Sequence, residues 1–207
     1  MYSKYLASLH FKYFTTSISI TMTKKLVVAV TGASGAIYAY RLLEHLKKET
    51  VYLIISRAAS LVIDEELGLT ENDFYKFAKF HYDENELNVP VASGSNELDA
   101  VIIVPASLST IAKISNGIED NLITRVAFVA IKENKKLIVV PRETPIPAIQ
   151  LHNMEKIATN GGIVLMASPP FYIHPESVDD LVNYMVGKIL DIIGISHNLY
   201  KRYKSNE

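Results

Sequence analysis

The sequence predicts a single α/β domain folded around a doubly wound parallel sheet, and two observations predict it. Short runs of aliphatic residues without polar alternation, such as 26–30 and 100–104, are typical of parallel strands covered on both faces. These runs alternate with segments whose apolar residues repeat at helical spacing, which is the pattern of βαβ units. A chain of 207 residues has a suitable length for one such domain.

The first half of the chain contains two strand–helix units and a shorter helix. Gly68 ends the second helix, and Thr70 is a capping residue for the third. Residues 83–95 contain Pro90 and Gly94 and are expected to form an irregular loop. The expected elements are a strand at 26–30, a helix from 36 to 48, a strand at 51–55, a helix at 58–67 and a helix from 71.

The second half continues the alternation. Pro105 is expected to close its first strand, Asp120 to cap a helix, and Pro147 to stand in the first turn of another. The expected elements are a strand at 100–104, helices at 107–115 and 120–134, a strand at 137–140, a helix at 147–159, a strand at 163–166 and a long helix from 175 or 176 to 193. This order is found in Rossmann-like and flavodoxin-like sheets.

The two ends of the chain differ from the region between them. Residues 1–21 contain no acidic residue and are interpreted as a disordered leader or a start assigned too far upstream. Residues 22–196 form the expected domain. The polar tail at 197–207 is expected to be solvated or to take part in oligomer contacts.

Composition excludes several classes of protein. The 21 Lys and Arg against 22 Asp and Glu give a net charge of -1, which provides no general attraction to nucleic acid or anionic lipid. The absence of cysteine excludes disulfides and thiolate metal sites, and the six His are scattered, so no metal is expected. No apolar run reaches membrane thickness, and a cytoplasmic protein with no membrane partner is expected.

Polar residues follow the carboxyl ends of several predicted strands. Ser34, Ser56, Ser107 and the pair Arg142-Glu143 each stand just after such a strand. Ligands of open α/β sheets bind at this edge, so the sequence predicts the functional site there.

The turn Thr31-Gly-Ala-Ser-Gly-Ala36 consists of small residues, so backbone N–H groups and a hydroxyl can approach a ligand at a helix N-terminus. It lacks the Lys-Ser/Thr of a Walker loop and departs from G-x-G-x-x-G, and a tight turn alone explains it equally well. The turn also resembles that of short-chain dehydrogenases, with Tyr184 and Lys188 as a Y-x-x-x-K pair. That pattern recurs at 75–79 and 200–204, which makes this alternative weak.

Two further segments carry chemistry. Pro105-Ala-Ser-Leu-Ser-Thr110 places three hydroxyls at the start of a helix, a neutral cradle for an anion or a flavin edge, whereas capping by Ser107 explains one hydroxyl. In Pro141-Arg-Glu-Thr-Pro145, Arg142 can bind phosphate oxygens with two hydrogen bonds. Glu143 beside a phosphate can pass a proton to a leaving group. An exposed ion pair without a role is the alternative.

A series of segments stands in a characteristic order: TGASGA, ISRAA (55–59), ASGS (92–95), PASLST with NGIEDNLITR, PRETP, LHNM (151–154), PPFY (169–172) and VGKILDIIGI. In order and spacing the series resembles the UbiX flavin prenyltransferases over about 25–195. The resemblance implies a metal-independent transferase that joins the dimethylallyl group of dimethylallyl phosphate to N5 and C6 of reduced FMN. It also implies a homo-oligomer, a dodecamer, whose product passes to a UbiD-type decarboxylase.

The resemblance also implies roles for individual residues. Those expected to hold FMN are Gly32, Ala33, Ser34, Ser56, Ser107, Leu108, Ser109, Thr110 and Arg125, with Ser34 near the reactive N5 atom. Those expected around dimethylallyl phosphate, from more than one subunit, are Ser93, Lys132, Arg142, Glu143, Tyr172 and Lys188. The expected catalytic residues are Glu143, Ser34 and Glu66, the last of which assists proton removal as the new ring closes.

The sequence departs from the family pattern at two positions. Lys188 stands where Arg is common, which keeps the charge but gives up the fork geometry. Leu87 stands where an aromatic wall is often found, six residues before Ser93.

Two other functions remain open at this point. An FMN-dependent cysteine decarboxylase would share the PASANT-like segment, but no His stands in the expected loop before it, whereas ASGS and PRETP are present. A non-enzymatic flavin carrier would leave Arg142-Glu143, Lys132 and Tyr172 without a role.

Overall fold

The computed structural model describes residues 23–202. The expected leader at 1–21 and the end of the tail at 203–207 lie outside the described residues. Within this range no helix is both long and apolar enough to cross a bilayer.

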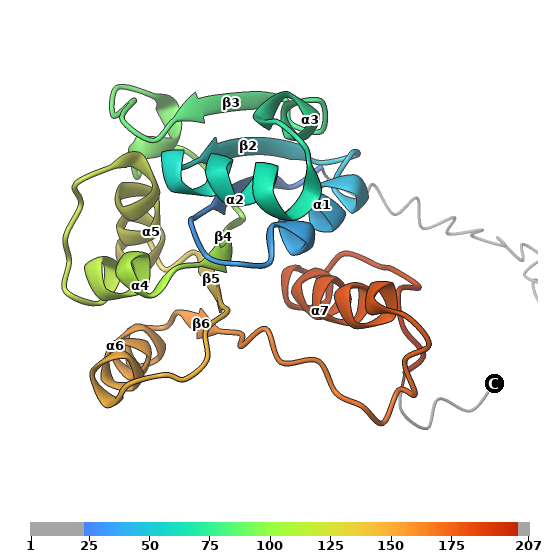
Figure 1. Cartoon of the computed structure of the whole chain (residues 1–207). Coiled ribbons are helices and arrows are strands. Elements are labelled where there is room, and N and C mark those ends of the chain that lie inside the picture. The colour runs from blue at the N-terminus through green and yellow to red at the C-terminus, as the bar shows by residue number, and fades with distance from the viewer. Residues whose placement is uncertain (1–22, 203–207) are drawn as a thin grey trace, which may run out of the picture.

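Six parallel strands form one sheet in the order β3-β2-β1-β4-β5-β6. The sheet confirms the predicted doubly wound fold (Figure 1). The chain winds outward in both directions from the centre, so the strand order reverses between β1 and β4. The strands are β1 (Lys25–Val30), β2 (Thr50–Ile55), β3 (Phe80–Asp83), β4 (Ala100–Ala106), β5 (Lys136–Pro141) and β6 (Ile163–Val164).

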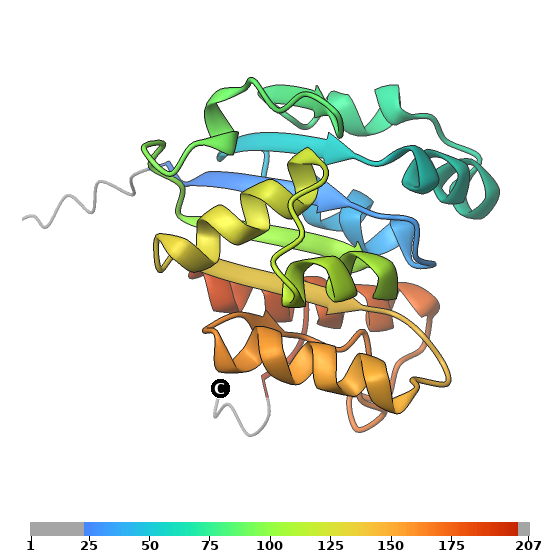
Figure 2. The same cartoon turned by 90° about the vertical axis from the view of Figure 1, so that its left-hand side faces the viewer.

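Helices cover both faces of the sheet (Figure 2). One layer packs on the core that contains Leu26 and Ile102, and it consists of α1 (Ala36–His45), α2 (Arg57–Leu67), α3 (Glu71–Tyr75) and α7 (Val178–Ile193). The other packs on the core that contains Val27 and Ile103, and it consists of the 3-10 turn η1 (Pro90–Ala92), α4 (Leu108–Ser115), α5 (Leu122–Lys132) and α6 (Ala148–Thr159). Successive residues of one strand thus enter opposite cores, as the pleat requires.

The sequence analysis missed β3, the edge strand Phe-His-Tyr-Asp at 80–83. Its residues pair only with β2 and are half-buried or exposed. A strand with one free edge and little burial carries no apolar run, so the signal that predicts the central strands is missing here.

Several boundaries also differ from the expectation. The strand β4 runs past Pro105 to Ala106, and β6 has only two residues. Asn121, not Asp120, caps α5 in a reciprocal arrangement with Thr124, whereas Asp120 pairs with Lys113. The helix α7 begins at Val178 after the cap Ser177, and α6 begins after Pro147. At the starts of α5 and α7, the cap is the residue whose side chain accepts a hydrogen bond from a backbone N–H of the first turn.

The start of the polar tail packs against α7 through His197 and Tyr200, while Asn198, Lys201 and Arg202 are exposed. Asp191 of α7 accepts a hydrogen bond from Tyr200 and from Arg202 Nη2 (2.7 Å), and it pairs with His197 Nε2 (3.1 Å). Only 4% of the His197 side chain is exposed. Burial raises the pKa of Asp191, but the hydrogen bonds from Arg202, Tyr200 and His197 outweigh it and lower the pKa to about 2.

We therefore expect Asp191→Asn to release the tail and to lower the free energy of unfolding by about 1–3 kcal/mol at neutral pH. Because the folded-state pKa of Asp191 lies below the unfolded value, its contribution is present above about pH 4. The contribution disappears as the pH falls toward about 2, the folded pKa. Urea unfolding between pH 2 and pH 7 checks this. A difference between wild type and variant that does not shrink with acid would contradict it, and Asp64→Asn, at an exposed position of α2, is the control.

Candidate functional site

Thr31 joins the two loops that diverge at the reversal of strand order. Its buried hydroxyl donates to the carbonyl oxygen of Pro105 (2.8 Å) and accepts a hydrogen bond from the backbone N–H of Ser107 (2.7 Å). These bonds fix the turn after β1 against the start of α4. Sequence reasoning singled out the turn but not this role of Thr31, because its partners lie more than seventy residues away.

Serine hydroxyls cap two helices at the same edge of the sheet. Ser56 accepts from the backbone N–H of Ala59 (3.1 Å) at the start of α2. Ser107 accepts from the backbone N–H of Thr110 (3.2 Å) at the start of α4, and its hydroxyl also lies 2.9 Å from the Thr110 hydroxyl. Leu108 and Ser109 occupy the first turn of α4 between them, and Ser109 is exposed.

Steric constraints explain why the turn after β1 consists of small residues. A Cβ at Gly32 would lie 2.5 Å from the Cβ of Ala58, so a side chain there would push α2 away. Gly35 has a φ of +108°, a left-handed conformation that L residues rarely adopt. Ala33 is buried beside them.

Glu66 fills the N-terminus of α1. Its carboxylate accepts hydrogen bonds from the backbone N–H groups of Gly35 (2.9 Å) and Ala36 (2.9 Å), although it comes from α2. Burial raises the pKa of Glu66, but hydrogen bonds from Ser34, Gly35 and Ala36 and the charge of Arg142 hold the pKa below its usual value. The expected anion site at this helix start is therefore occupied by an ionised side chain.

A cavity of about 400 Å³ opens beside this carboxylate. Leu61 and Val62 give it an apolar wall, while Ser34, Glu65 and Glu66 provide polar groups. Leu61 is 72% exposed, which is unusual for a large aliphatic side chain.

Arg142 reaches from the loop after β5 to the β1 turn. Its Nε donates to the carbonyl oxygen of Ser34 (3.2 Å). Burial raises the pKa of the nearby Tyr38, and the positive charge of Arg142 partly offsets this increase. The neighbouring Glu143 is exposed, and its carboxylate accepts from the backbone N–H of Thr144 (3.0 Å). The pair Arg142-Glu143 thus lies at the carboxyl edge beside Ser34.

Ser93 and Lys132 lie close to each other and away from that pair, whereas Arg125 stands near the start of α5. Arg125 donates to the carbonyl oxygen of Ala92 (3.1 Å) and pairs with Glu119. Lys132 pairs with Glu133 (3.3 Å), which packs against Gly94 next to Ser93. Lys132 precedes β5 whereas Arg142 follows it, and a strand of six residues separates them by on the order of 20 Å.

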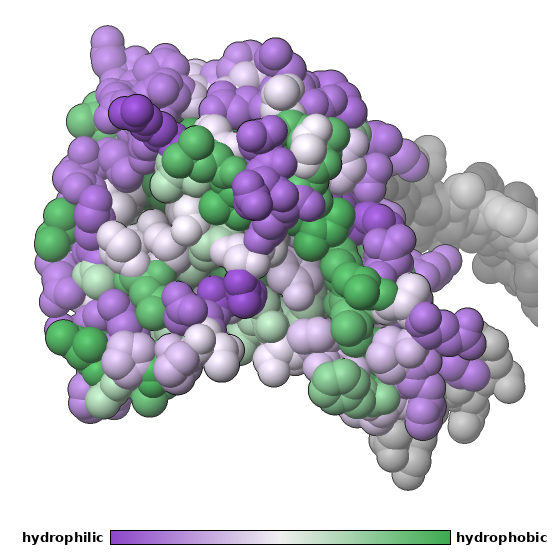
Figure 3. Space-filling model, in the orientation of Figure 1, coloured by the Kyte–Doolittle hydropathy of each residue, from purple (hydrophilic) through white to green (hydrophobic). Residues whose placement is uncertain are grey.

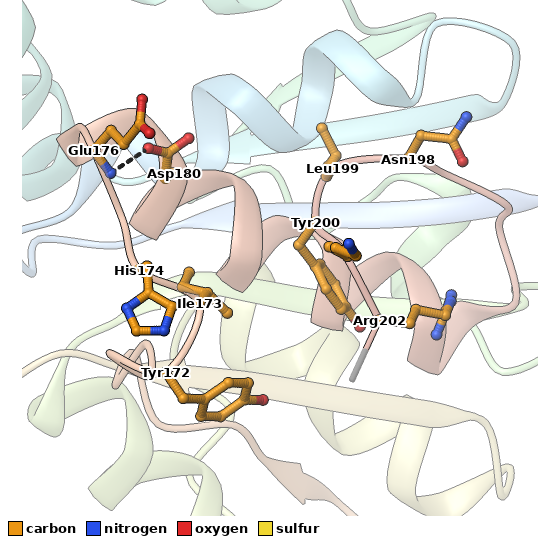
Figure 4. Close-up of a pocket in the computed structure, with 10 residues that line it drawn as sticks. Tyr172, Ile173, His174, Glu176, Asp180, Asn198, Leu199, Tyr200 and Arg202 are labelled. Atoms are coloured by element: carbon orange, nitrogen blue, oxygen red, sulfur yellow. Dashed lines mark hydrogen bonds between the residues drawn. The ribbon is translucent and has the colours of Figure 1, made fainter. Parts of the chain in front are cut away.

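Tyr172 and Lys188 form another group, on the segment after β6 and on α7. The Tyr172 hydroxyl lies 3.2 Å from that of Tyr184, and this hydrogen bond raises the pKa of Tyr172, while the charge of Lys188 lowers it. Tyr172 is 57% exposed. It faces a cavity whose other wall is the C-terminal segment (Figure 4).

One chain therefore gathers Ser34, Ser56, Ser107, Thr110, Glu66 and Arg142-Glu143 at the carboxyl edge, and leaves Ser93 and Lys132 outside this group. The surface over this edge is hollowed, with weakly polar residues in the hollow and hydrophobic side chains around it (Figure 3). Among residues 23–202, no group of three or more His, Asp or Glu side chains is placed to hold a metal ion.

The model of the flavoprotein family matches residues 17–190 of the chain. A curated relative, the flavin prenyltransferase UbiX of Methanocaldococcus jannaschii, is 47% identical over 180 residues, which cover 86% of this chain and 98% of the relative.

Solved structures agree with the family match. The structure of AnUbiX (PadA1) with FMN and dimethylallyl pyrophosphate has a TM-score of 0.87 and 34% identity, covering 89% of this chain and 100% of that one. A dodecameric FMN-dependent UbiX-like decarboxylase from Escherichia coli O157:H7 has a TM-score of 0.85 and 35% identity, covering 87% and 100%. The peptidyl-cysteine decarboxylase EpiD is 23% identical with a TM-score of 0.56, covering 72% and 83%, which shows a shared fold alone.

The contacts of Thr31 yield a prediction. Thr31→Val keeps the shape of the side chain but removes its hydroxyl, leaving the N–H of Ser107 without this partner. We expect a loss of about 1–3 kcal/mol in the free energy of unfolding. Thr31→Ser, which keeps the hydroxyl, is expected to restore most of it. A loss in Thr31→Ser as large as that in Thr31→Val, measured by urea unfolding, would contradict the assignment of this stability to the hydrogen bonds of the hydroxyl.

Proposed function

The chain belongs to the UbiX flavin prenyltransferases within the flavoprotein family, and we propose that it joins a dimethylallyl group to N5 and C6 of reduced FMN. The observation that carries this proposal is the contact of Arg142 with the carbonyl oxygen of Ser34. It puts a cation and the neighbouring carboxyl group beside the turn to which the resemblance assigns the flavin N5 atom.

In the proposed reaction, one bond of the allyl phosphate breaks and two new bonds to the flavin form. The C–O bond of the allyl phosphate breaks, and the bonding electrons leave with the phosphate. N5 of reduced FMN supplies the electron pair for the new C–N bond and loses its proton. The double bond of the transferred group then takes up a proton, and its tertiary carbon forms a C–C bond with C6, which loses its own proton as the fourth ring closes. Arg142 stabilises the departing phosphate, and Glu143 gives it a proton.

The carboxyl edge offers groups suited to FMN. Thr31 holds the β1 turn against the start of α4, so Gly32, Ala33 and Ser34 face the hydroxyls of Ser107 and Thr110 across the crevice where such sheets bind ligands. Ser56, Leu108 and Ser109 stand on the same edge. Arg125, which the resemblance also assigns to FMN, is proposed to bind the phosphate of FMN.

Glu66 is proposed as the base that takes the proton lost as the ring closes. The position of Glu66 supports this, because its carboxylate lines the same cavity as Ser34. Hydrogen bonds from the backbone N–H groups of Gly35 and Ala36 hold it there. Through the same bonds Glu66 also caps the N-terminus of α1.

We propose that Ser93 and Lys132 act in the site of a neighbouring subunit. Within one chain β5 separates Lys132 from Arg142, so both can touch one phosphate only if two copies contribute. Tyr172 and Lys188 would complete the phosphate pocket. A dodecamer fits this division, as the E. coli UbiX-like protein is dodecameric.

The donor is proposed to be dimethylallyl phosphate, although AnUbiX was crystallised with the pyrophosphate. The prenylated flavin would pass to a UbiD-type decarboxylase in the cytoplasm. Residues 22–196 are proposed to be the catalytic domain.

Anaerobic incubation of the protein with reduced FMN and dimethylallyl phosphate should yield a flavin heavier by one prenyl unit, measured by mass spectrometry. Glu143→Gln keeps the size of the side chain but cannot donate the proton, so the rate should fall by about 10²–10⁴-fold. Glu155→Gln, on the exposed face of α6, is the control and should leave the rate unchanged. Unmodified flavin from wild type after prolonged incubation would favour the flavin carrier or the cysteine decarboxylase.

A site shared between subunits can be tested by mixing. Lys132→Ala and Glu143→Gln should each be inactive alone, because each removes one group from every site. Co-expressed, the two variants should recover part of the wild-type rate, since some sites then receive both intact groups. No recovery in mixed oligomers, verified by mass spectrometry, would place Lys132 and Glu143 in the same subunit's site or outside the site.

A further inference from the structure

The C-terminal segment forms one wall of the cavity that Tyr172 faces (Figure 4). The cavity has a volume of about 580 Å³. Its walls are the 172–180 segment on one side and residues 198–202 on the other. The segment that the sequence analysis expected to be solvated is thus part of the surroundings of a proposed substrate residue.

Contacts between tyrosines connect Tyr172 to the fixed part of the tail. The hydroxyls of Tyr172 and Tyr184 lie 3.2 Å apart. The rings of Tyr184 and Tyr200 pack with their centroids 4.7 Å apart, and the Tyr200 hydroxyl donates to Asp191. Both Tyr184 and Asp191 belong to α7, so this helix holds both ends of the connection.

Gly187 makes room for this arrangement. A Cβ at this helical position would lie 2.6 Å from Cε1 of Tyr200 and 2.7 Å from Cε1 of His197. The helix interior normally disfavours glycine, by about 1 kcal/mol relative to alanine. Here the glycine lets two rings of the tail lie directly on α7.

We propose that Tyr184, braced by Tyr200, is a positioning residue that holds the Tyr172 hydroxyl at the substrate phosphate beside Lys188. This inference rests on the proposed function of Tyr172. Neither Tyr184 nor Tyr200 needs to touch substrate.

The physical reason is the exposure of Tyr172. It stands on a segment without helix or strand between β6 and α7, and more than half of its surface is exposed. An exposed phenol samples several rotamers, and ordering it on binding costs affinity. A hydrogen bond to a helical side chain whose ring is packed against Tyr200 supplies that order beforehand.

The first test is kinetic. Tyr184→Phe keeps the ring that packs on Tyr200 and removes only the hydroxyl. The KM for dimethylallyl phosphate should rise by about two- to tenfold, as expected for one lost hydrogen bond, while kcat and FMN affinity stay unchanged. Tyr200→Ala, which removes the brace, should change KM in the same direction. A fall in kcat without a change in KM would overturn the proposal.

A matched control separates positioning from general stability. The hydroxyl of Tyr75 also donates to a carboxylate, that of Glu71, but it lies in α3, away from the cavity. Tyr75→Phe should leave KM unchanged. In addition, Tyr184→Phe should have no further effect on KM once Tyr172→Phe has removed the hydroxyl it positions. Additive effects of the two substitutions would overturn the proposal.

A measurement without turnover tests the proposal independently of the proposed function. In the full-length protein with 13C-labelled tyrosine, the pKa of the Tyr172 phenol should be lower in Tyr184→Phe than in wild type, because the raising hydrogen bond is lost while Lys188 remains. An unchanged titration would overturn the positioning role. If wild type fails to prenylate FMN, the proposed function falls, and the titration still decides whether Tyr184 holds Tyr172.

Discussion

The buried hydroxyl of Thr31 is the contact on which the carboxyl edge of the sheet depends. The chain leaves β1 and β4 toward opposite faces, so the loops that follow them would diverge without a direct link. By donating to Pro105 and accepting from Ser107, Thr31 fixes the β1 turn relative to the start of α4. The groups of residues 32–34 and 107–110 that are proposed to hold FMN owe their arrangement to this link, since they stand on the two segments that it joins.

At the same edge, side chains of the protein already occupy the helix N-termini that could bind an anion. Glu66 occupies the N-terminus of α1, while Ser56 and Ser107 satisfy backbone N–H groups at the starts of α2 and α4. A substrate phosphate must then be bound chiefly by cationic side chains. Arg142 stands beside the flavin turn, and the proposed two-subunit site adds Lys132, which explains how a chain with a net charge of -1 can bind a dianion.

The central strands were predictable because a strand that is buried on both faces consists of an uninterrupted run of apolar residues. All seven residues of β4 are buried, and its apolar run reflects this. The edge strand β3 was missed because it pairs on one side only and includes His81 and Asp83. The contacts of the tail were not predicted for a related reason: His197, Tyr200 and Arg202 are polar, and polarity alone does not indicate that all three form hydrogen bonds with Asp191.

The sequence by itself determined the order of the helices and of all strands except β3, the edge at which the polar residues gather, and the family. These depend on periodicity, turns and motif spacing, which are properties of neighbouring residues. The tertiary structure alone decided that Glu66 caps a helix 31 residues away and that Tyr184 connects Tyr172 to the tail. Such contacts join distant segments, and only the packing of helices on the sheet brings their side chains within hydrogen-bonding distance.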